Sequence, residues 1–206
     1  MFSQSLIHLV CVCNQISLVI PVNFQEECFV LSEDSGRCPD NQCEYCQSVG
    51  RLLPDIVAAI LGALGFRVLV NDGQSNGVDL EVFDKEGSLV FVAEITNWSS
   101  FSRMSEKRKN WIISNLSQYE CNKVLICTAL ENESILSDLS FYGISLLKIG
   151  YQVLPENYYE HYARKNQVIR RRIDSEETRE DIKSKIENYL RNSQIKIPPC
   201  LSNMID

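Results

Sequence analysis

Two acidic residues fall within segments that otherwise have the composition of buried strands. Residues 77–96, GVDLEVFDKEGSLVFVAEIT, predict two strands joined by a tight turn, with Asp79 in the first strand and Glu94 in the second. Side chains alternate between the two faces of a strand, so residues of the same parity share a face. The residues expected on one face of this hairpin are Asp79, Glu81, Val92, Glu94 and Thr96.

The two carboxylates are expected to lie close together. If the turn centres on Lys85 and Glu86, Asp79 lies opposite Val92 and diagonal to Glu94. Diagonal neighbours in an antiparallel pair are about 7–8 Å apart at the backbone, so two acidic side chains can reach one ion. Mg²⁺ prefers such oxygen ligands together with water and phosphate, which is the arrangement that phosphodiester hydrolysis requires. The alternative is an edge hairpin whose polar face simply meets solvent.

The surrounding pattern supplies the elements that must position these acids. Apolar residues recur at helical spacing from Leu52 to Leu64, and Gly65 follows as a C-cap. The predicted order is helix, three strands, helix, strand, helix and strand, which corresponds to a mixed three-layer α/β core. Outside the hairpin, the expected elements are a helix at 48–64, a strand at 66–70, a helix at 99–118, a strand at 122–130, a helical turn at 132–139 and a strand at 143–150.

The motifs GVDLEVFD and VFVAEIT, lying between two predicted helices, resemble the PD-(D/E)XK nuclease superfamily over residues 48–150. The resemblance implies a restriction-endonuclease-like core and a metal-dependent endonuclease that hydrolyses phosphodiester bonds in DNA. It further implies that Asp79 and Glu94 hold Mg²⁺ or Mn²⁺, with the backbone carbonyl of Ile95 completing the ligand set. A homodimer stays open, since many such nucleases act as dimers to cut two strands.

Thr96 is a departure from this pattern, because the family carries a lysine at that position. The lysine positions or activates the attacking water, and a hydroxyl cannot supply its positive charge. We expect Thr96 to act together with Lys107 or Lys109, which the following helix would bring to the site. The alternative is a catalytically degenerate nuclease-fold module that binds nucleic acid or a protein partner.

The resemblance also implies an acidic residue from the first helix, and Asp55 is the available candidate. Pro54 beside it indicates a helix start or a kink. Under the other interpretation, Asp55 is an ordinary first-turn acid that interacts favourably with the helix dipole.

A Cys-rich N-terminal segment, residues 1–47, precedes this core. It begins with two short apolar strands and ends in a turn-rich stretch that contains closely spaced cysteines. Four thiolates can form a closed tetrahedral zinc site, and a two-residue gap between cysteines is usual in such sites. Free thiols and an iron–sulfur cluster are the alternatives. The expected structural zinc ligands are Cys28, Cys38, Cys43 and Cys46.

Composition and charge bound the remaining possibilities. The chain has 206 residues, 45% of them hydrophobic, and a net charge of −7, which argues against a surface adapted as a whole to nucleic acid. Its nine cysteines, an odd number, favour a reducing intracellular and cytoplasmic location, and the apolar N-terminus is too interrupted for a membrane span. Residues 151–206 predict a charged helical extension. The basic stretch 163–172 either grips a DNA duplex or pairs with acids from Asp174 onward.

Overall fold

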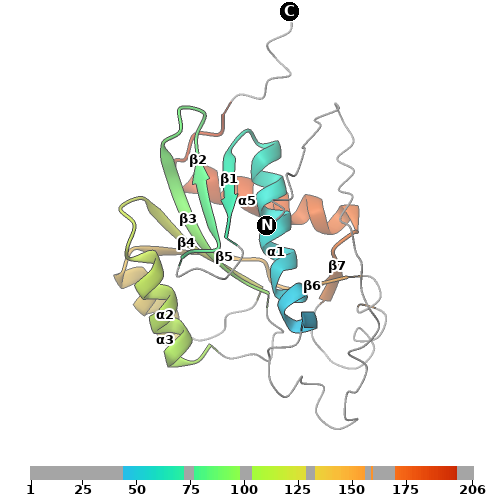
Figure 1. Ribbon diagram of the computed structural model, residues 1–206, viewed down its shortest axis with the longest axis horizontal. Helices are drawn as coiled ribbons and strands as arrows, with labels where there is room; N and C mark the ends of the chain where they lie inside the picture. The colour runs from blue at the N-terminus through green and yellow to red at the C-terminus, as the bar shows by residue number, and fades with distance from the viewer. Residues whose placement is uncertain are drawn as a thin grey trace, which may run out of the picture.

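The computed structural model describes residues 44–71, 77–97, 104–128, 133–155, 159 and 170–198. Its centre is a five-stranded sheet whose strands follow the chain order (Figure 1). The first three strands are antiparallel and the last three are parallel, so the direction changes at the middle strand. The mixed α/β class is therefore confirmed. The strands are β1 (Arg67–Val70), β2 (Leu80–Phe83), β3 (Leu89–Thr96), β4 (Asn122–Cys127) and β5 (Ile144–Lys148).

Helices cover both faces of the sheet and enclose two separate apolar clusters. One cluster joins α1 (Glu44–Ala63) and α5 (Glu176–Asn192) to the face formed by Leu80, Ala93 and their neighbours. The other joins α2 (Glu106–Leu116) and α3 (Glu133–Phe141) to the opposite face. In the part of the chain that the structure describes, no helix is long and apolar enough to cross a membrane.

The middle strand β3 is buried on both faces because each cluster covers one of them. Phe91, Ala93 and Ile95 lie in the α1/α5 cluster, whereas Val92 lies in the α2/α3 cluster. Glu94 has the parity of Val92, so its side chain is directed towards α2. The acidic residue therefore lies in a fully buried part of the sheet.

The β2–β3 hairpin has a different register from the predicted one. Asp84 and Ser88 close a three-residue loop, in which Gly87 has a φ of 85°. A second irregularity lies between Val82 and Phe83. Each feature shifts the register by one residue, and because the two shifts add, every side chain keeps its predicted face.

The changed register brings the two acids closer than the sequence predicted. Leu80 pairs with Ala93, so continuing the ladder by one residue makes Asp79 level with Glu94. The prediction that Asp79 lies opposite Val92 was wrong, because it assumed a two-residue turn without a bulge.

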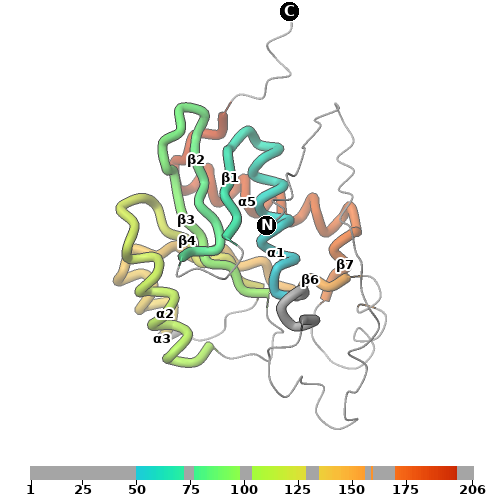
Figure 2. The backbone as a smooth tube through the Cα atoms, in the orientation of Figure 1, coloured from blue at the N-terminus to red at the C-terminus, as the bar shows by residue number. Residues whose placement is uncertain are grey.

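The C-terminal segment packs onto the same core. A short parallel pair, β6 (Gln152–Leu154) and β7 (Arg170–Arg172), leads into α5, and the traces of α1 and α5 lie together (Figure 2). Buried side chains at helical spacing on α5 join the α1/α5 cluster: Ile182, Ile186 and Leu190. The charged character predicted for this helix therefore belongs only to its outer side.

The arginines of β7 pair with acids that follow them in the chain. The guanidinium of Arg171 lies 3.4 Å from Glu177, and that of Arg172 lies 2.5 Å from Asp174. Arg171 also covers the ring of Tyr151 at 4.5 Å. At the described end of the basic stretch, Arg171 and Arg172 thus pair with acids, and contact of this stretch with DNA stays a prediction.

We expect Leu190→Ala to lower the free energy of unfolding of the whole chain by about 2–5 kcal/mol, because Leu190 is fully buried against α1 and the sheet. Leu136→Ala is the matched control, because it shortens a partly exposed leucine on α3. It should lower the free energy of unfolding much less. Urea unfolding monitored by circular dichroism measures both. A global transition unmoved by Leu190→Ala would mean that α5 melts as a separate extension.

Candidate active site

Asp79 is fastened at the start of β2 by backbone hydrogen bonds on both sides. The N–H of Asn71 donates to its carbonyl oxygen at 2.9 Å, which extends the β1–β2 ladder. The N–H of Ile95 donates to its Oδ2 atom at 2.6 Å. The Asp79 carboxylate thus bridges to β3, one residue beyond Glu94.

Glu94 is completely buried, with an exposed fraction of 0%. The side-chain amide of Asn115 on α2 donates to its Oε1 atom at 3.2 Å. Its Oε2 atom has no hydrogen-bond partner within the described ranges. A buried carboxylate oxygen in this state is costly, and native structures keep such a group where it serves a role.

The electrostatics of Glu94 follow from this burial. Burial and, to a smaller extent, the neighbouring charge of Asp79 raise its pKa to about 8, against the opposing effects of Asn115 and Arg108. Burial also raises the pKa of Asp79, opposed by the Ile95 N–H and by Arg108. The charge of Asp79 acts on Glu94, and the strand register makes the two residues level, so their carboxyl groups lie on neighbouring strands within electrostatic range of each other.

The cation nearest to these acids in the described chain is Arg108. Its Nη2 atom lies 3.7 Å from Oε2 of Glu94, which makes an ion pair but is too long for a hydrogen bond. Its guanidinium lies over the ring of Trp111, 4.1 Å from the centroid. The helix phase that allows this is fixed at Ser105, whose Oγ accepts the N–H of Arg108 at 3.2 Å.

The sequence interpretation missed both Arg108 and Asn115. The two are seven residues apart, so they lie on the same face of α2, above β3. The Ser105 cap together with this spacing was the available signal. It was overlooked because Arg108 stands between two lysines that carry the same charge.

Neither predicted lysine is brought to the acids. Lys109 pairs with Glu106 at 2.7 Å and with Asp138 on α3, and these partners raise its pKa. The side chain of Lys107 is exposed. The cation beside Glu94 in the described chain is therefore Arg108, in place of Lys107 or Lys109.

The two other predicted residues differ in their surroundings. Thr96 is buried at the end of β3, on the same face as Glu94, and its hydroxyl has no hydrogen-bond partner in the described part of the chain. Asp55 is exposed on α1, the helix that covers the opposite face of the sheet. It lies well inside this helix, which begins at Glu44 and continues through Pro54, so it is neither part of the acid pair nor a first-turn acid.

The donor set at this site fits a hard divalent cation. It offers two carboxylates on neighbouring strands, one with an unsatisfied oxygen, and Mg²⁺ is commonly held by one or two carboxylates plus its own waters. Glu81, on the same strand face, accepts a hydrogen bond from the Tyr119 hydroxyl at 3.0 Å and is engaged there. In the described ranges, no three His, Cys, Asp or Glu side chains gather into a metal-binding group.

The predicted zinc ligands cannot be placed in this site. Cys28, Cys38 and Cys43 lie outside the described residues, and Cys46 is described only by its backbone in α1. Of the described cysteines, Cys127 is buried on β4, where burial raises its pKa to about 12. Such a thiol remains protonated and packs as a small apolar group.

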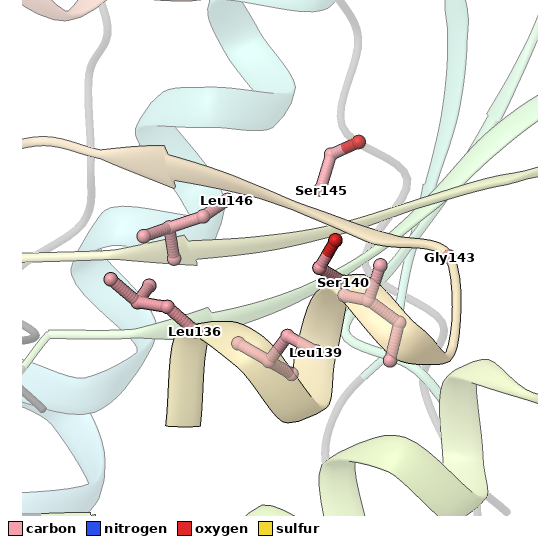
Figure 3. A pocket seen from close by; sticks show the side chains of 7 residues that line it. Leu136, Leu139, Ser140, Gly143, Ser145 and Leu146 are labelled. Carbon is pink, nitrogen blue, oxygen red and sulfur yellow. The ribbon is translucent and has the colours of Figure 1, made fainter. Parts of the chain in front are cut away.

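A hollow of about 410 Å³ lies between α3 and β5, away from the acid pair (Figure 3). Its lining contains leucines and two serines but no ionisable side chain, so it offers neither a proton donor nor a metal ligand set. The lining residues are Leu136, Leu139, Ser140, Gly143, Ile144, Ser145 and Leu146.

Comparisons with known proteins add little to this geometry. No family model and no curated protein matches the chain. A solved structure titled "Crystal Structure of Protein of Unknown Function AF1548" is similar over 52% of this chain and 60% of its own, at 16% identity and a TM-score of 0.38. The chain thus spans less than two thirds of that structure.

The buried acid predicts an unusual dependence of stability on pH. The pKa of Glu94 is near 8 in the folded protein and about 4.5 when unfolded, so the native state holds the extra proton between these values. Without metal, the free energy of unfolding should fall as pH rises from about 5 to about 8, by up to about 1.4 kcal/mol per pH unit. Glu94→Gln keeps an acceptor for Asn115 and should flatten this slope.

Urea unfolding in EDTA between pH 5 and 9 measures the effect. Glu81→Gln, on the same strand face, is the matched control and should retain the wild-type slope. A wild-type slope unchanged by Glu94→Gln would mean that this carboxyl group is ionised throughout.

Proposed function

We propose that this chain is a metal-dependent nuclease that hydrolyses phosphodiester bonds in DNA. The observation that carries the proposal is the buried Glu94 carboxylate, whose Oε2 atom lacks a hydrogen-bond partner in the described chain while the charge of Asp79 acts on it from the neighbouring strand. Burying a carboxylate beside a second one opposes folding, and a divalent cation offsets that cost. The arrangement therefore suits a metal ligand better than a structural acid.

The fold supports the same proposal. An acidic residue at the start of β2 and another near the end of β3, in a sheet that changes from antiparallel to parallel at β3, agree with a restriction-endonuclease-like core of the PD-(D/E)XK type. A homodimer, which would bring two such sites together, stays a prediction. The zinc site and the intracellular location stay predictions.

Each residue of the site has a role that its surroundings support. Asp79, Glu94 and the Ile95 carbonyl would hold Mg²⁺ or Mn²⁺, which when bound supplies Lewis-acid stabilisation of the phosphate and activation of water. Arg108, partly exposed at 36%, can bind a phosphate oxygen on its solvent side while staying beside Glu94. The Thr96 hydroxyl can donate a hydrogen bond at the same strand end.

A second candidate function rests on the ion pair between Arg108 and Glu94. This pair neutralises the acid without a metal, and Thr96 stands where the resembled family has a lysine. A nuclease-fold module that binds nucleic acid or a protein partner without cutting is consistent with both facts. The two candidates differ in whether a metal is required.

Cleavage assays separate these functions. With Mg²⁺ or Mn²⁺, the wild-type protein should cut at least one member of a panel of single-stranded, duplex and branched DNA substrates. EDTA should abolish this activity. Asp79→Ala and Glu94→Ala should each lower the rate by about 100-fold or more, because each removes charge stabilisation at the reacting phosphate. Glu81→Ala is the matched acidic control, and its cleavage rate should stay near that of the wild type.

Cleavage that survives both site variants would point to a contaminating nuclease. Binding without any cleavage would favour the second candidate.

Arg108 gives an independent prediction. Arg108→Ala should lower the cleavage rate by about 10-fold to 100-fold, with a partial return in Arg108→Lys, because a lysine keeps the charge but loses the planar fork. Lys109→Gln is the control, since Lys109 pairs with Glu106 and Asp138. A larger loss in the Lys109 variant than in the Arg108 variant would contradict this assignment.

A further inference from the structure

A small hollow of about 260 Å³ opens at the first turns of α2. It is lined by Ser105, Lys107, Arg108 and Trp111. Trp111 is 39% exposed, so part of its indole ring is accessible to a ligand next to two cations. The hollow thus combines an aromatic platform with positive charge.

One side chain connects this hollow to the acid pair. Arg108 lines the hollow, lies over the indole of Trp111 at 4.1 Å and has its Nη2 atom 3.7 Å from Glu94. A molecule that occupies the hollow therefore contacts the same guanidinium that faces the buried acid. The hollow and the acid pair therefore share the Arg108 side chain.

We propose that this hollow binds an unpaired nucleobase of single-stranded DNA next to the phosphate that is cut, an inference that rests on the proposed nuclease function. The base stacks on the exposed surface of Trp111, and the adjoining phosphates contact Lys107 and Arg108. In a continuous duplex each base is already stacked on its neighbours and cannot present its face to the indole. The preferred substrate class is accordingly single-stranded DNA, including unpaired ends.

The competing role of Trp111 is purely structural, as a surface that orients Arg108 through a cation–π contact. In that case Trp111 would affect cleavage through Arg108 but would not make binding depend on bases. A DNA strand that keeps its phosphates but lacks its bases distinguishes the two roles.

The test is DNA binding by the full chain in EDTA, where no cleavage occurs. Fluorescence anisotropy compares a single strand of about 12 nucleotides, an abasic strand of equal length and the blunt duplex of the same sequence. The wild type should bind the base-bearing strand about 10-fold more tightly than the abasic strand, and more tightly than the duplex. Trp111→Ala should reduce this ratio to near one, while Trp111→Phe should retain most of it.

Phe141→Ala is the matched control, because it removes an aromatic ring that is 83% exposed on α3. It should leave the ratio unchanged. Equal wild-type affinity for base-bearing and abasic strands, tighter binding of the duplex, or a ratio that persists in Trp111→Ala would each overturn the inference.

Binding and cleavage results together distinguish failure of the base-binding inference from failure of the nuclease proposal. Base-dependent binding that vanishes in Trp111→Ala, in a protein that cuts no DNA with Mg²⁺ or Mn²⁺, supports the hollow and overturns the nuclease. Metal-dependent cutting of duplex DNA without base-dependent binding overturns the hollow and supports the nuclease.

Discussion

A carboxylate without access to water governs the organisation of this protein. Glu94 lies on the middle strand of the sheet, between apolar clusters on both faces, and burial is the largest cause that raises its pKa to about 8. An acid in that position opposes folding unless its surroundings compensate for the lost hydration. The Asn115 amide and the Arg108 guanidinium provide part of that compensation from α2. Asp79 works against it from the start of β2.

The rest of the fold is consistent with keeping this arrangement rigid. The β1–β2 ladder and the Ile95 N–H fix Asp79 at the strand end, so it cannot turn away from Glu94 to relieve the repulsion. The Ser105 cap fixes the phase of α2, and thereby the residues that face β3. The carboxyl groups of Asp79 and Glu94 cannot both ionise without repelling each other, and a bound cation relieves that repulsion. This is the physical basis for favouring a metal site over a polar patch.

The positive charge beside Glu94 comes from helix α2 and not from the strand that carries the acid. The strand position that would carry a lysine in the resembled family holds Thr96, and the guanidinium arrives instead from the neighbouring helix. A guanidinium has a planar set of donors, so it can contact Glu94 with one edge, lie on Trp111 with its face, and keep other donors for a phosphate. A lysine ammonium could not serve all three at once. The choice of Arg108 thus links the acid pair to the exposed indole.

The order of elements and the shared face of Asp79 and Glu94 were determined by the sequence itself, because both follow from local periodicity, of period two in strands and 3.6 in helices. The exact register was not, since the three-residue loop closed by Gly87 and the irregularity at Val82 displace pairing by amounts that alternation cannot detect. The tertiary structure alone decided that Arg108, rather than Lys107 or Lys109, faces the acids, and that α5 joins the core. Both depend on how helices are rotated and packed against the sheet, and that rotation is set by contacts between residues far apart in the chain.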